Sequence, residues 1–537
     1  MPNGTMMNVP LTIHRIVERC KTELSHVEVV WRAPDRSIHR TTYGEVMRRA
    51  EAMARGLLAM GIKKGDRVAT LMWNHDAHLT AYFGVPLSGA ILHTLNLRLH
   101  PDEIAFIAND AGDKVIFVDQ VLLPLFEKFR AAVPFDKVFV VGADGKVTGT
   151  DVDYEAWLAA APKEGPLPEA AEEDAMGMCY TSGTTGKPKG VVYTHRSTVL
   201  HALVSALPDS LCLSRADTIL PVVPMFHVNA WGLPYTAAMV GAKQVHPGPH
   251  LDAPSILDLM ESEKVTVAAG VPTIWLGIRD ALDKSPGKWK LMTGVRMIVG
   301  GSAVPEKLVR DFDRQGLTLL HAWGMTETSP IGLVSRLTPE VRDADENTRY
   351  RLRAKQGVPV PFVDVRVRNE QGDVPRDEKT SGEVLVRGPW ITGRYFGLDA
   401  KERFTSDGYF RTGDVANVDR FGFVQLVDRI ADLIKSGGEW IATVELENAL
   451  MGHPAVREAA VVGVPHPKWS ERPIAAVVMK EGAVVSEDEL RAHLAPLFAK
   501  FWLPDSFVFM DAIPRTSAGK FKKTELREKL RDHYAQK

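Results

Sequence analysis

The sequence has few cysteines, no excess of charge of either sign and no long apolar run. Its three cysteines, Cys20, Cys179 and Cys212, are too few and too scattered for a disulfide framework or a zinc site. The 65 Lys and Arg residues nearly balance the 67 Asp and Glu residues, which argues against a generally basic nucleic-acid binder. No apolar stretch approaches the roughly 18 residues that span a bilayer. With no visible secretory signal at the N-terminus, we expect a globular protein of the cytoplasm without a transmembrane segment.

Helix-period and strand-like segments alternate over the first 300 residues of the 537. Apolar residues recur at helical spacing over residues 46–57, and short runs at 68–73, 116–118 and 138–141 are typical of buried strands. Strands separated by helices predict parallel sheets built from βαβ units. A Pro- and Glu-rich stretch at 161–174 predicts a surface linker.

The pattern changes in the last third of the chain. Strand-like segments at 363–367, 382–387 and 421–427, with no long helix between them, predict a mostly β subdomain. Beyond Asp428 we expect a small α+β unit with the following elements: a helix at 444–451, strands at 459–464 and 474–479, and a helix that begins at Ser486, where Glu489 completes a capping box.

The most informative stretch is residues 180–190, Tyr-Thr-Ser-Gly-Thr-Thr-Gly-Lys-Pro-Lys-Gly. Its glycines let backbone amides face an anion, its hydroxyls add donors, and Lys187 and Lys189 add positive charge. Only two residues separate Gly183 from Gly186, and Pro188 follows the lysine, so this is not the loop of P-loop NTPases. The pattern predicts a phosphate-binding loop between two strands.

Residues 180–190 resemble the signature loop of the adenylate-forming superfamily, which includes acyl-CoA synthetases, peptide-synthetase adenylation domains and luciferases. Segments 223–235 and 430–440 are most similar to bacterial medium- and long-chain fatty acyl-CoA synthetases. The superfamily's other motifs follow in order at 224–227, 300–303, 323–327, 409–414, 428–429, 435–439 and 514–520.

The resemblance implies an α/β fold. Residues 1–428 would form a large N-terminal domain of stacked α/β sheets plus a β subdomain. Residues 429–433 would be a hinge, and residues 434–537 a small mobile α+β C-terminal domain. The chain would use ATP, Mg²⁺ and coenzyme A to convert a fatty acid into acyl-CoA through an acyl-adenylate. Short-chain, methylthio-substituted and aryl acids remain alternatives, and the nearest relatives suggest a homodimer that could contact a membrane transiently.

The resemblance also implies the nucleotide site. Asp414, at the end of an expected strand, would accept the ribose hydroxyls, with a turn-capping carboxylate as the alternative. Trp323 would stack on adenine, unless it is an ordinary core aromatic. Glu327 and Thr181 would hold Mg²⁺, which prefers oxygen ligands. The implied nucleotide-binding residues are Thr181, Ser182, Gly183, Thr184, Thr185, Gly186, Lys187, Lys189, Gly301, Ser302, His321, Ala322, Trp323, Gly324, Thr326, Asp414, Arg429 and Lys435.

The implied catalytic residues are His227, Thr326, Glu327 and Lys520. Lys520 would contact both the carboxylate and the α-phosphate, and both Lys520 and Glu327 argue against a non-catalytic nucleotide-binding protein. His227 is not expected to be a general base, because a carboxylate needs no deprotonation at neutral pH. The chain departs from a thermophilic member of the family at Ala431, where that enzyme has lysine. The implied acyl- and thioester-side residues are His227, Val228, Trp231, Gly301 and Trp440, with Trp231 as an aromatic gate.

Overall fold

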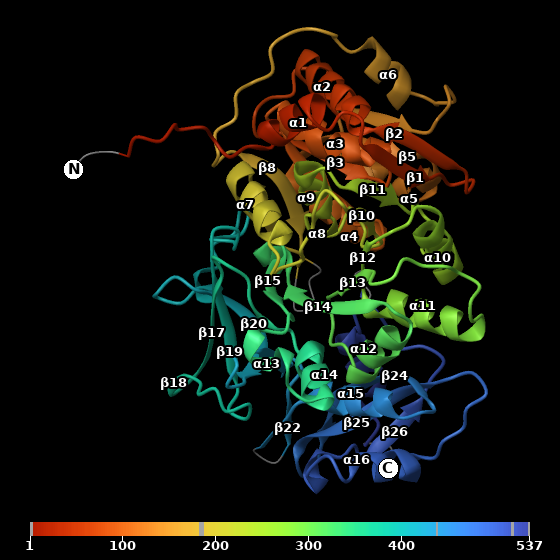
Figure 1. Cartoon of the computed structure of the whole chain (residues 1–537), viewed down its shortest axis with the longest axis vertical. Coiled ribbons are helices and arrows are strands. Elements are labelled where there is room, and N and C mark those ends of the chain that lie inside the picture. Colours follow the sequence, from red (N-terminus) through yellow and green to blue (C-terminus); the bar gives the residue numbers. More distant parts are fainter. Residues whose placement is uncertain (1–3, 182–186, 437–438, 517–519, 535–537) are drawn as a thin grey trace.

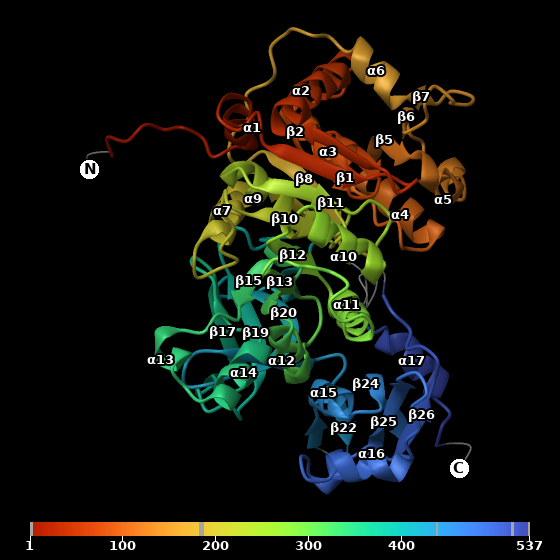
Figure 2. The ribbon, with the colours of Figure 1, turned by 45° about the vertical axis from the view of Figure 1, so that its right-hand side comes forward.

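The computed structural model describes residues 4–181, 187–436, 439–516 and 520–534, which form four β-sheets (Figure 1). Two large α/β sheets are stacked, an antiparallel sheet follows, and a fourth sheet near the C-terminus lies at the end of the molecule farthest from α2 (Figure 2). The expected α/β class, with stacked sheets and a smaller C-terminal unit, is confirmed. Among the described residues, no helix is long and apolar enough to cross a membrane.

The first large sheet has seven strands in the order β7-β6-β5-β3-β4-β8-β9. All neighbouring pairs are parallel except β8 and β9. The predicted strands at 68–73, 116–118 and 138–141 are confirmed as β3, β5 and β6. The bounds are β3 (Arg67–Leu71), β4 (Ile91–Thr94), β5 (Asp113–Asp119), β6 (Lys137–Val141), β7 (Val152–Asp153), β8 (Ala175–Tyr180) and β9 (Gly190–Thr194).

The second large sheet has nine strands in the order β16-β15-β14-β13-β12-β10-β11-β1-β2. Six consecutive strands, from β14 to β1, run parallel, and the antiparallel pairs lie at its two edges. The bounds are β1 (Glu28–Arg32), β2 (Ile38–Thr42), β10 (Thr218–Pro221), β11 (Lys243–His246), β12 (Val267–Gly270), β13 (Arg296–Val299), β14 (Thr318–Gly324), β15 (Ile331–Val334) and β16 (Val358–Pro359).

The main core lies between these two sheets, where helices pack against both. Helix α3 (Asp76–Leu87) is buried at every position from Ala77 onward, as expected for a helix that has no polar face. The predicted helix at 46–57 is α2 (Tyr43–Ala59). The side chain of the preceding residue, Thr42, accepts the Glu45 N–H and caps the first turn. The other helices of this layer are α1 (Ile13–Thr22), α6 (Tyr154–Ala160), α7 (His195–Ala206) and α9 (Leu233–Val240).

Two further helical layers cover the outer faces of the sheets. Helices α4 (Pro101–Ala111) and α5 (Leu123–Phe126) pack on the seven-stranded sheet, and α10 (Ala253–Ser262), α11 (Pro272–Lys284) and α12 (Glu306–Arg314) pack on the nine-stranded sheet. Residues 161–174 contain no helix or strand, as predicted for a linker. Three short elements complete this part: α8 (Val228–Trp231), α13 (Pro339–Arg342) and α14 (Glu346–Ala354).

The third sheet is the predicted β subdomain, but two of its strands differ from the prediction. Strand β20 runs through the 409–414 motif, so Asp414 lies within the strand rather than at its end. The last strand begins later than 421, because the Asp419 carboxylate accepts the backbone N–H groups of Phe421 and Phe423 at 2.9 and 3.0 Å and holds a turn there. The strands are β17 (Asp364–Asn369), β18 (Gly372–Asp373), β19 (Gly382–Arg387), β20 (Phe410–Val418) and β21 (Val424–Arg429).

The fourth sheet forms the C-terminal α+β unit, with an apolar cluster on each face. Helices α15 (Thr443–Gly452) and α16 (Glu487–Leu494) cover one face and α17 (Lys523–Leu530) covers the other. The predicted capping box of Ser486 and Glu489 is confirmed at the start of α16. The strands are β22 (Ile434–Ser436), β23 (Glu439–Ile441), β24 (Val456–His466), β25 (Ser470–Met479) and β26 (Ser506–Phe509).

Asp428 joins the third sheet to this C-terminal unit. Its buried carboxylate, near the end of β21, accepts the backbone N–H of Thr443 at 2.6 Å and the Thr443 hydroxyl at 2.7 Å. Because a negative charge at a helix N-terminus satisfies free N–H groups, this contact caps α15. On the other side of the same junction, the Arg527 guanidinium of α17 donates to the Ala431 carbonyl at 3.0 Å and pairs with Asp432.

We predict that Asp428→Ala lowers the free energy of unfolding by about 1–3 kcal/mol, because it leaves the buried Thr443 donors without a partner. Chemical denaturation followed by circular dichroism measures this. The control is Asp488→Ala, since the Asp488 side chain is 95% exposed and its pair with Arg491 should contribute little. Equal stability of the two variants would show that the Asp428 cap does not hold α15.

Candidate active site

The expected phosphate-binding loop connects the antiparallel strands β8 and β9, as predicted. At its base the Thr181 N–H donates to the Lys189 carbonyl at 2.9 Å, and the Lys189 N–H donates to the Thr181 hydroxyl at 3.2 Å. These bonds close the loop at its two ends. The predicted loop residues Ser182, Gly183, Thr184, Thr185 and Gly186 lie outside the described residues.

The two lysines of the loop contact aromatic rings. The Lys189 ammonium lies 5.1 Å from the centre of the Tyr395 ring, and the Lys187 ammonium lies 5.2 Å from the centre of the Phe106 ring. Cation–π contacts of this kind hold a positive charge in place without cancelling it. Both charges therefore stay available to an anion at the loop.

Asp414 is held by two donors on opposite sides of its carboxylate. The Trp323 indole N–H donates to Oδ2 at 2.9 Å, and the Arg429 Nε lies 3.3 Å from Oδ1. The pairing of β20 with β21 places Asp414 opposite Arg429, and β14 brings Trp323 from the nine-stranded sheet. The structure thus brings three predicted nucleotide residues together and fixes the orientation of a buried carboxylate. Trp323 is 7% exposed and also packs in the adjoining apolar cluster.

Glu327 is a buried carboxylate that carries one hydrogen bond from Tyr395. It lies in a 3₁₀ turn, Thr326–Thr328, is 5% exposed, and its Oε1 accepts the Tyr395 hydroxyl at 2.7 Å. The Tyr193 hydroxyl donates to the Thr326 carbonyl at 2.9 Å and fixes the same turn. Burial, and then Glu327, raise the pKa of Tyr395, so its hydroxyl remains a donor.

Tyr395 is a site residue that the sequence did not reveal. It stands 68 positions from Glu327 along the chain and belongs to no spacing that indicates chemistry. The fold brings it near because the Thr392 N–H donates to the Glu327 carbonyl at 2.7 Å, which lays residues 392–395 along the turn. Only the three-dimensional structure shows that Tyr395 contacts Glu327.

The donor set around Glu327 suits a hard cation that is completed by phosphates. Tyr395 donates to one of the two carboxylate oxygens of Glu327, and the Thr181 hydroxyl lies at the base of the loop. Among the described residues there is no group of three His, Cys, Asp or Glu side chains that could hold a metal. Mg²⁺ in nucleotide sites is commonly bound by one or two carboxylates plus substrate phosphates, so the residues present fit this ion.

Glycines form the wall behind the site because no larger residue fits. A Cβ on Gly324 would lie 1.7 Å from the Pro330 carbonyl oxygen, and a Cβ on Gly300 would lie 2.9 Å from the Ala322 carbonyl oxygen. Gly301 has a φ of 91°, which favours glycine. Ser302, beside it, is exposed.

His321 and Ala322 belong to β14, and the Ala322 carbonyl oxygen lies at the glycine wall. His321 Nδ1 lies 2.9 Å from the Ala354 carbonyl oxygen, and burial lowers the pKa of His321 to about 4, so its ring is neutral at pH 7.

Lys520 reaches this wall from the C-terminal unit. Its Cε lies 3.8 Å from the position that a Cβ on Gly301 would take. Burial, and then the positive charge of Arg429, lower the pKa of Lys520 to about 8, although Asp414 and Glu327 oppose both effects. The structure therefore brings the predicted catalytic lysine to the same place as Gly301, Asp414 and Glu327.

His227 is buried and lies within electrostatic reach of Lys520. Burial, and then the positive charges of Lys520 and Arg98, lower the pKa of His227 to about 4. Its imidazole is therefore neutral at pH 7. Val228 is buried, and the Trp231 ring lies against Gly300 and is only partly exposed.

Lys435 and Trp440 form a separate pair on the hairpin of β22 and β23. The Lys435 ammonium lies 5.6 Å from the centre of the Trp440 ring, which is 54% exposed. Within the described part of the chain, neither side chain makes a hydrogen bond or ion pair with the residues around Lys520. The structure therefore does not gather these two predicted residues with the others.

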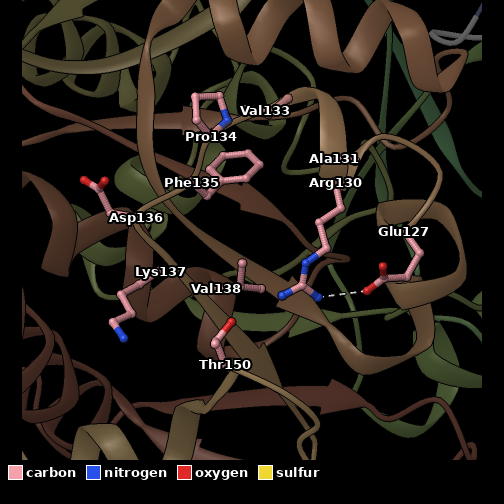
Figure 3. A pocket seen from close by; sticks show the side chains of 10 residues that line it. All are labelled: Glu127, Arg130, Ala131, Val133, Pro134, Phe135, Asp136, Lys137, Val138 and Thr150. Carbon is pink, nitrogen blue, oxygen red and sulfur yellow. Dashed lines mark hydrogen bonds and ion pairs between the residues drawn. The ribbon is translucent and has the colours of Figure 1, made fainter.

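A hollow of about 430 Å³ lies elsewhere, on the seven-stranded layer between residues 127 and 150 (Figure 3). Arg130 is its most prominent charged group, but the guanidinium is engaged by Glu127 at 2.9 Å and by Asp151 at 3.0 Å. None of the predicted site residues lines this hollow.

Two family models match the chain. One describes an AMP-binding enzyme and matches residues 17–396, and the other describes the C-terminal domain of AMP-binding enzymes and matches residues 445–520. The first spans the phosphate-binding loop and the turn that carries Glu327. The second ends at Lys520.

Curated relatives match over almost the whole chain. A long-chain-fatty-acid–CoA ligase of Thermus thermophilus is 50% identical, covering 99% of this chain and 98% of the relative. A medium-chain-fatty-acid–CoA ligase of Ectopseudomonas oleovorans is 41% identical, and a 3-methylmercaptopropionyl-CoA ligase of Ruegeria lacuscaerulensis is 40% identical. Coverage is 98% of this chain in both cases, and 98% and 99% of the respective relatives.

Solved structures share the fold. An anthranilate–CoA ligase in complex with anthranoyl-AMP has a TM-score of 0.87 at 25% identity, covering 98% of this chain and 99% of that one. ATP-bound MatB from Rhodopseudomonas palustris has a TM-score of 0.82 at 26% identity, covering 98% and 100%. From the motifs, the site that they build and the family model that spans most of the chain, this protein belongs to the AMP-binding enzyme family.

Proposed function

We propose that this protein is an ATP-dependent fatty acid–CoA ligase that forms acyl-CoA, AMP and pyrophosphate through an acyl-adenylate. The observation that carries the proposal is the position of Lys520, a lysine of the C-terminal unit that lies beside Gly301, within the electrostatic reach of Asp414, Arg429 and Glu327. A movable cation at a nucleotide site is what a reaction between two anions requires.

In the first half-reaction the fatty-acid carboxylate attacks the α-phosphorus of ATP, a P–O bond forms, and pyrophosphate leaves. Both reactants are negative, so positioning and charge neutralisation supply most of the rate. Asp414, held by Trp323 and Arg429, would bind the ribose, and Lys520 would neutralise the carboxylate and the α-phosphate together. His227 would orient the carboxylate as a neutral imidazole.

Glu327 and Thr181 would hold Mg²⁺ on the phosphates. When bound, the ion would neutralise phosphate charge and orient the triphosphate. Tyr395 would keep Glu327 in place by its hydrogen bond, and Lys187 and Lys189 would add positive charge at the loop.

In the second half-reaction the sulfur of CoA attacks the acyl carbonyl and AMP leaves. We place the hinge at residues 429–433, between an N-terminal domain of residues 1–428 and a C-terminal domain of residues 434–537. Rotation there would remove Lys520 and bring another face of the C-terminal domain to the site. The exposed pair of Lys435 and Trp440 suits the thioester side, since it stands apart from Lys520 in this orientation.

The direct test is a pyrophosphate-release screen of the purified chain with ATP, Mg²⁺ and straight-chain acids of increasing length. Short, methylthio-substituted and aryl acids complete the panel. We expect medium to long fatty acids to give the highest kcat/KM. A chain active only on aryl or methylthio acids would contradict the fatty-acid assignment, and release of inorganic phosphate instead of pyrophosphate would contradict the ligase assignment. The homodimer and the cytoplasmic location stay predictions, and light scattering of the purified chain tests the former.

We predict that Lys520→Ala slows acyl-adenylate formation by roughly 10²- to 10³-fold, the usual effect of losing one well-placed charge at a developing phosphoryl transition state. Thioester formation from prepared acyl-AMP and CoA should change far less, because Lys520 would have left the site. Single-turnover assays of each half-reaction measure this. Lys522→Ala is the control, since that neighbouring lysine is 51% exposed and pairs with Glu525.

The same lysine sets a pH dependence. The pKa of Lys520 is about 8, well below the 10.5 of a free lysine, and the ammonium is the competent form. The kcat/KM of adenylation should therefore fall as the pH rises through about 8, since this parameter reports the free enzyme.

Equal slowing of both half-reactions in Lys520→Ala would contradict the two-orientation mechanism.

We predict that Tyr395→Phe raises the Mg²⁺ concentration needed for half-maximal ATP binding by on the order of 10- to 100-fold, as loss of a partner of a metal ligand usually does. Glu327→Gln should have a larger effect. Calorimetric titration of ATP at several Mg²⁺ concentrations measures both. The control is Tyr154→Phe, which removes another buried tyrosine hydroxyl, in α6. If Tyr395→Phe binds Mg·ATP as the parent does, Glu327 needs no positioning by Tyr395.

A further inference from the structure

The backbone turns left-handed for five consecutive residues directly after His227. The φ angles are 39° at Val228, 52° at Asn229, 47° at Ala230, 58° at Trp231 and 70° at Gly232. L-residues visit this region singly, because the Cβ crowds the following carbonyl oxygen, and a β-branched residue such as Val228 is an outlier there. Four of the five residues are not glycine. Such a run persists only where its surroundings impose it, and clusters of this kind mark clamps and switches.

One buried side chain anchors the left-handed turn, residues 228–232, to the seven-stranded sheet. Asn229 is 5% exposed, and its Oδ1 accepts the Cys179 thiol of β8 at 3.3 Å. The Asn229 amide nitrogen lies 3.5 Å from where a Cβ on Gly177 would stand, so the amide packs over that glycine of β8. Thr94 of β4 lies 3.4 Å from the same sulfur and donates to the Phe226 carbonyl at 3.3 Å.

The other end of the left-handed turn is fixed by His201. A Cβ on Gly232 would lie 2.7 Å from two atoms of the His201 ring, so only glycine fits. The Ile331 N–H donates to His201 Nε2 at 3.3 Å, which fixes that ring in turn. The right-handed helix α9 begins at the next residue, Leu233. Because Asn229 and Gly232 are both held, a change from the left-handed to the ordinary backbone conformation would fall on the residues between them, which include Trp231.

The left-handed turn holds the Trp231 ring against the glycine wall of the active site. Cη2 of Trp231 lies 3.4 Å from the position that a Cβ on Gly300 would take. Gly300 precedes Gly301, which faces Lys520. In the proposed function, Trp231 would be the gate between the nucleotide and the fatty-acyl chain.

We propose that Asn229 is a positioning residue that sets which acids the enzyme accepts, because its bond to Cys179 keeps the strained turn left-handed and so keeps Trp231 closed on Gly300. Opening the turn to an ordinary backbone conformation would swing the ring away and admit longer acyl chains. Asn229 itself need not touch the substrate. The inference rests on the proposed fatty acid–CoA ligase activity.

The first test compares Asn229→Ala, Trp231→Ala and the double variant across straight-chain acids. Each single variant should shift the ratio of kcat/KM for the longest acid to that for the shortest by on the order of tenfold toward the longer acid, through KM rather than kcat. Because Asn229 acts through Trp231, the double variant should match Trp231→Ala alone. Additive shifts would show a general structural effect and overturn the proposal.

A second variant should move selectivity the other way. Glycine occupies the left-handed region freely, so Ala230→Gly favours the closed turn over the open one. The preference for longer acids should fall by on the order of five- to tenfold, the size expected from removing one Cβ clash. A shift in the same direction as that of Asn229→Ala would contradict the role of backbone strain.

Substitutions at Cys179 supply a further test and a rescue, and a substitution at Cys20 supplies a matched control. Cys179→Ala removes the donor to Asn229 and should shift selectivity as Asn229→Ala does, whereas Cys179→Ser keeps a donor and should behave like the parent. Cys20→Ala removes a buried thiol of α1, which donates to the Ala238 carbonyl of α9 at 3.4 Å. This variant should leave selectivity unchanged. If Asn229→Ala does not fold, the Cys179 and Cys20 variants still test the proposal. If Cys179→Ala matches Cys20→Ala, the proposal is wrong.

The parent's own profile separates this failure from failure of the proposed function. A parent that releases pyrophosphate with fatty acids, together with variants whose length profiles equal the parent's, would overturn only the positioning role of Asn229. A parent that activates no fatty acid would overturn the proposed function itself, and the inference with it.

Discussion

The repulsion between a carboxylate and a triphosphate is the constraint on which the structure depends. Separate parts of the chain supply positive charge: Lys189 of the loop lies on the Tyr395 ring that bonds Glu327, Arg429 at the end of β21 pairs with Asp414, and Lys520 of the C-terminal unit lies within electrostatic reach of both carboxylates. Two buried carboxylates, Asp414 and Glu327, lie among them and are each held by a hydrogen bond from an aromatic side chain. Buried charges need partners of this kind, which explains why the stacked sheets, the β subdomain and the C-terminal unit all meet here.

Much of this arrangement could be predicted because motifs of this family are local in sequence. The loop at 180–190, the turn around Glu327 and the loop before α17 each carry their chemistry within a few consecutive residues, and their resemblance to one superfamily gave the fold. Alternation of helical and strand-like periods predicted the parallel sheets, since buried strands and amphipathic helices differ in period. The capping box at Ser486 was predictable for the same reason, because its two partners are three residues apart.

What the sequence could not give are contacts between distant segments. Tyr395 meets Glu327, and Cys179 meets Asn229, across 68 and 50 positions, and neither pair has a spacing that indicates contact. Strand β20 continues to Val418 instead of ending at Asp414. The start of β21 was placed too early, because Asp419 bonds the backbone of the turn before it. The left-handed turn was hidden too, since Val228 and Trp231 are residues that ordinarily favour strands. Tertiary anchors there override local preference.

In the proposed mechanism, the orientation with Lys520 in the site makes acyl-adenylate and must be left before acyl-CoA forms. The Lys284 ammonium of α11 lies 3.5 Å from the Glu481 carboxylate of the C-terminal unit, and both side chains are exposed. Cysteines introduced at these two positions and joined by a short bis-maleimide would lock this orientation. We predict that the locked enzyme releases pyrophosphate and accumulates acyl-AMP but forms no acyl-CoA, while the unlinked double variant forms acyl-CoA normally. Formation of acyl-CoA by the locked enzyme at the unlinked rate would contradict the account.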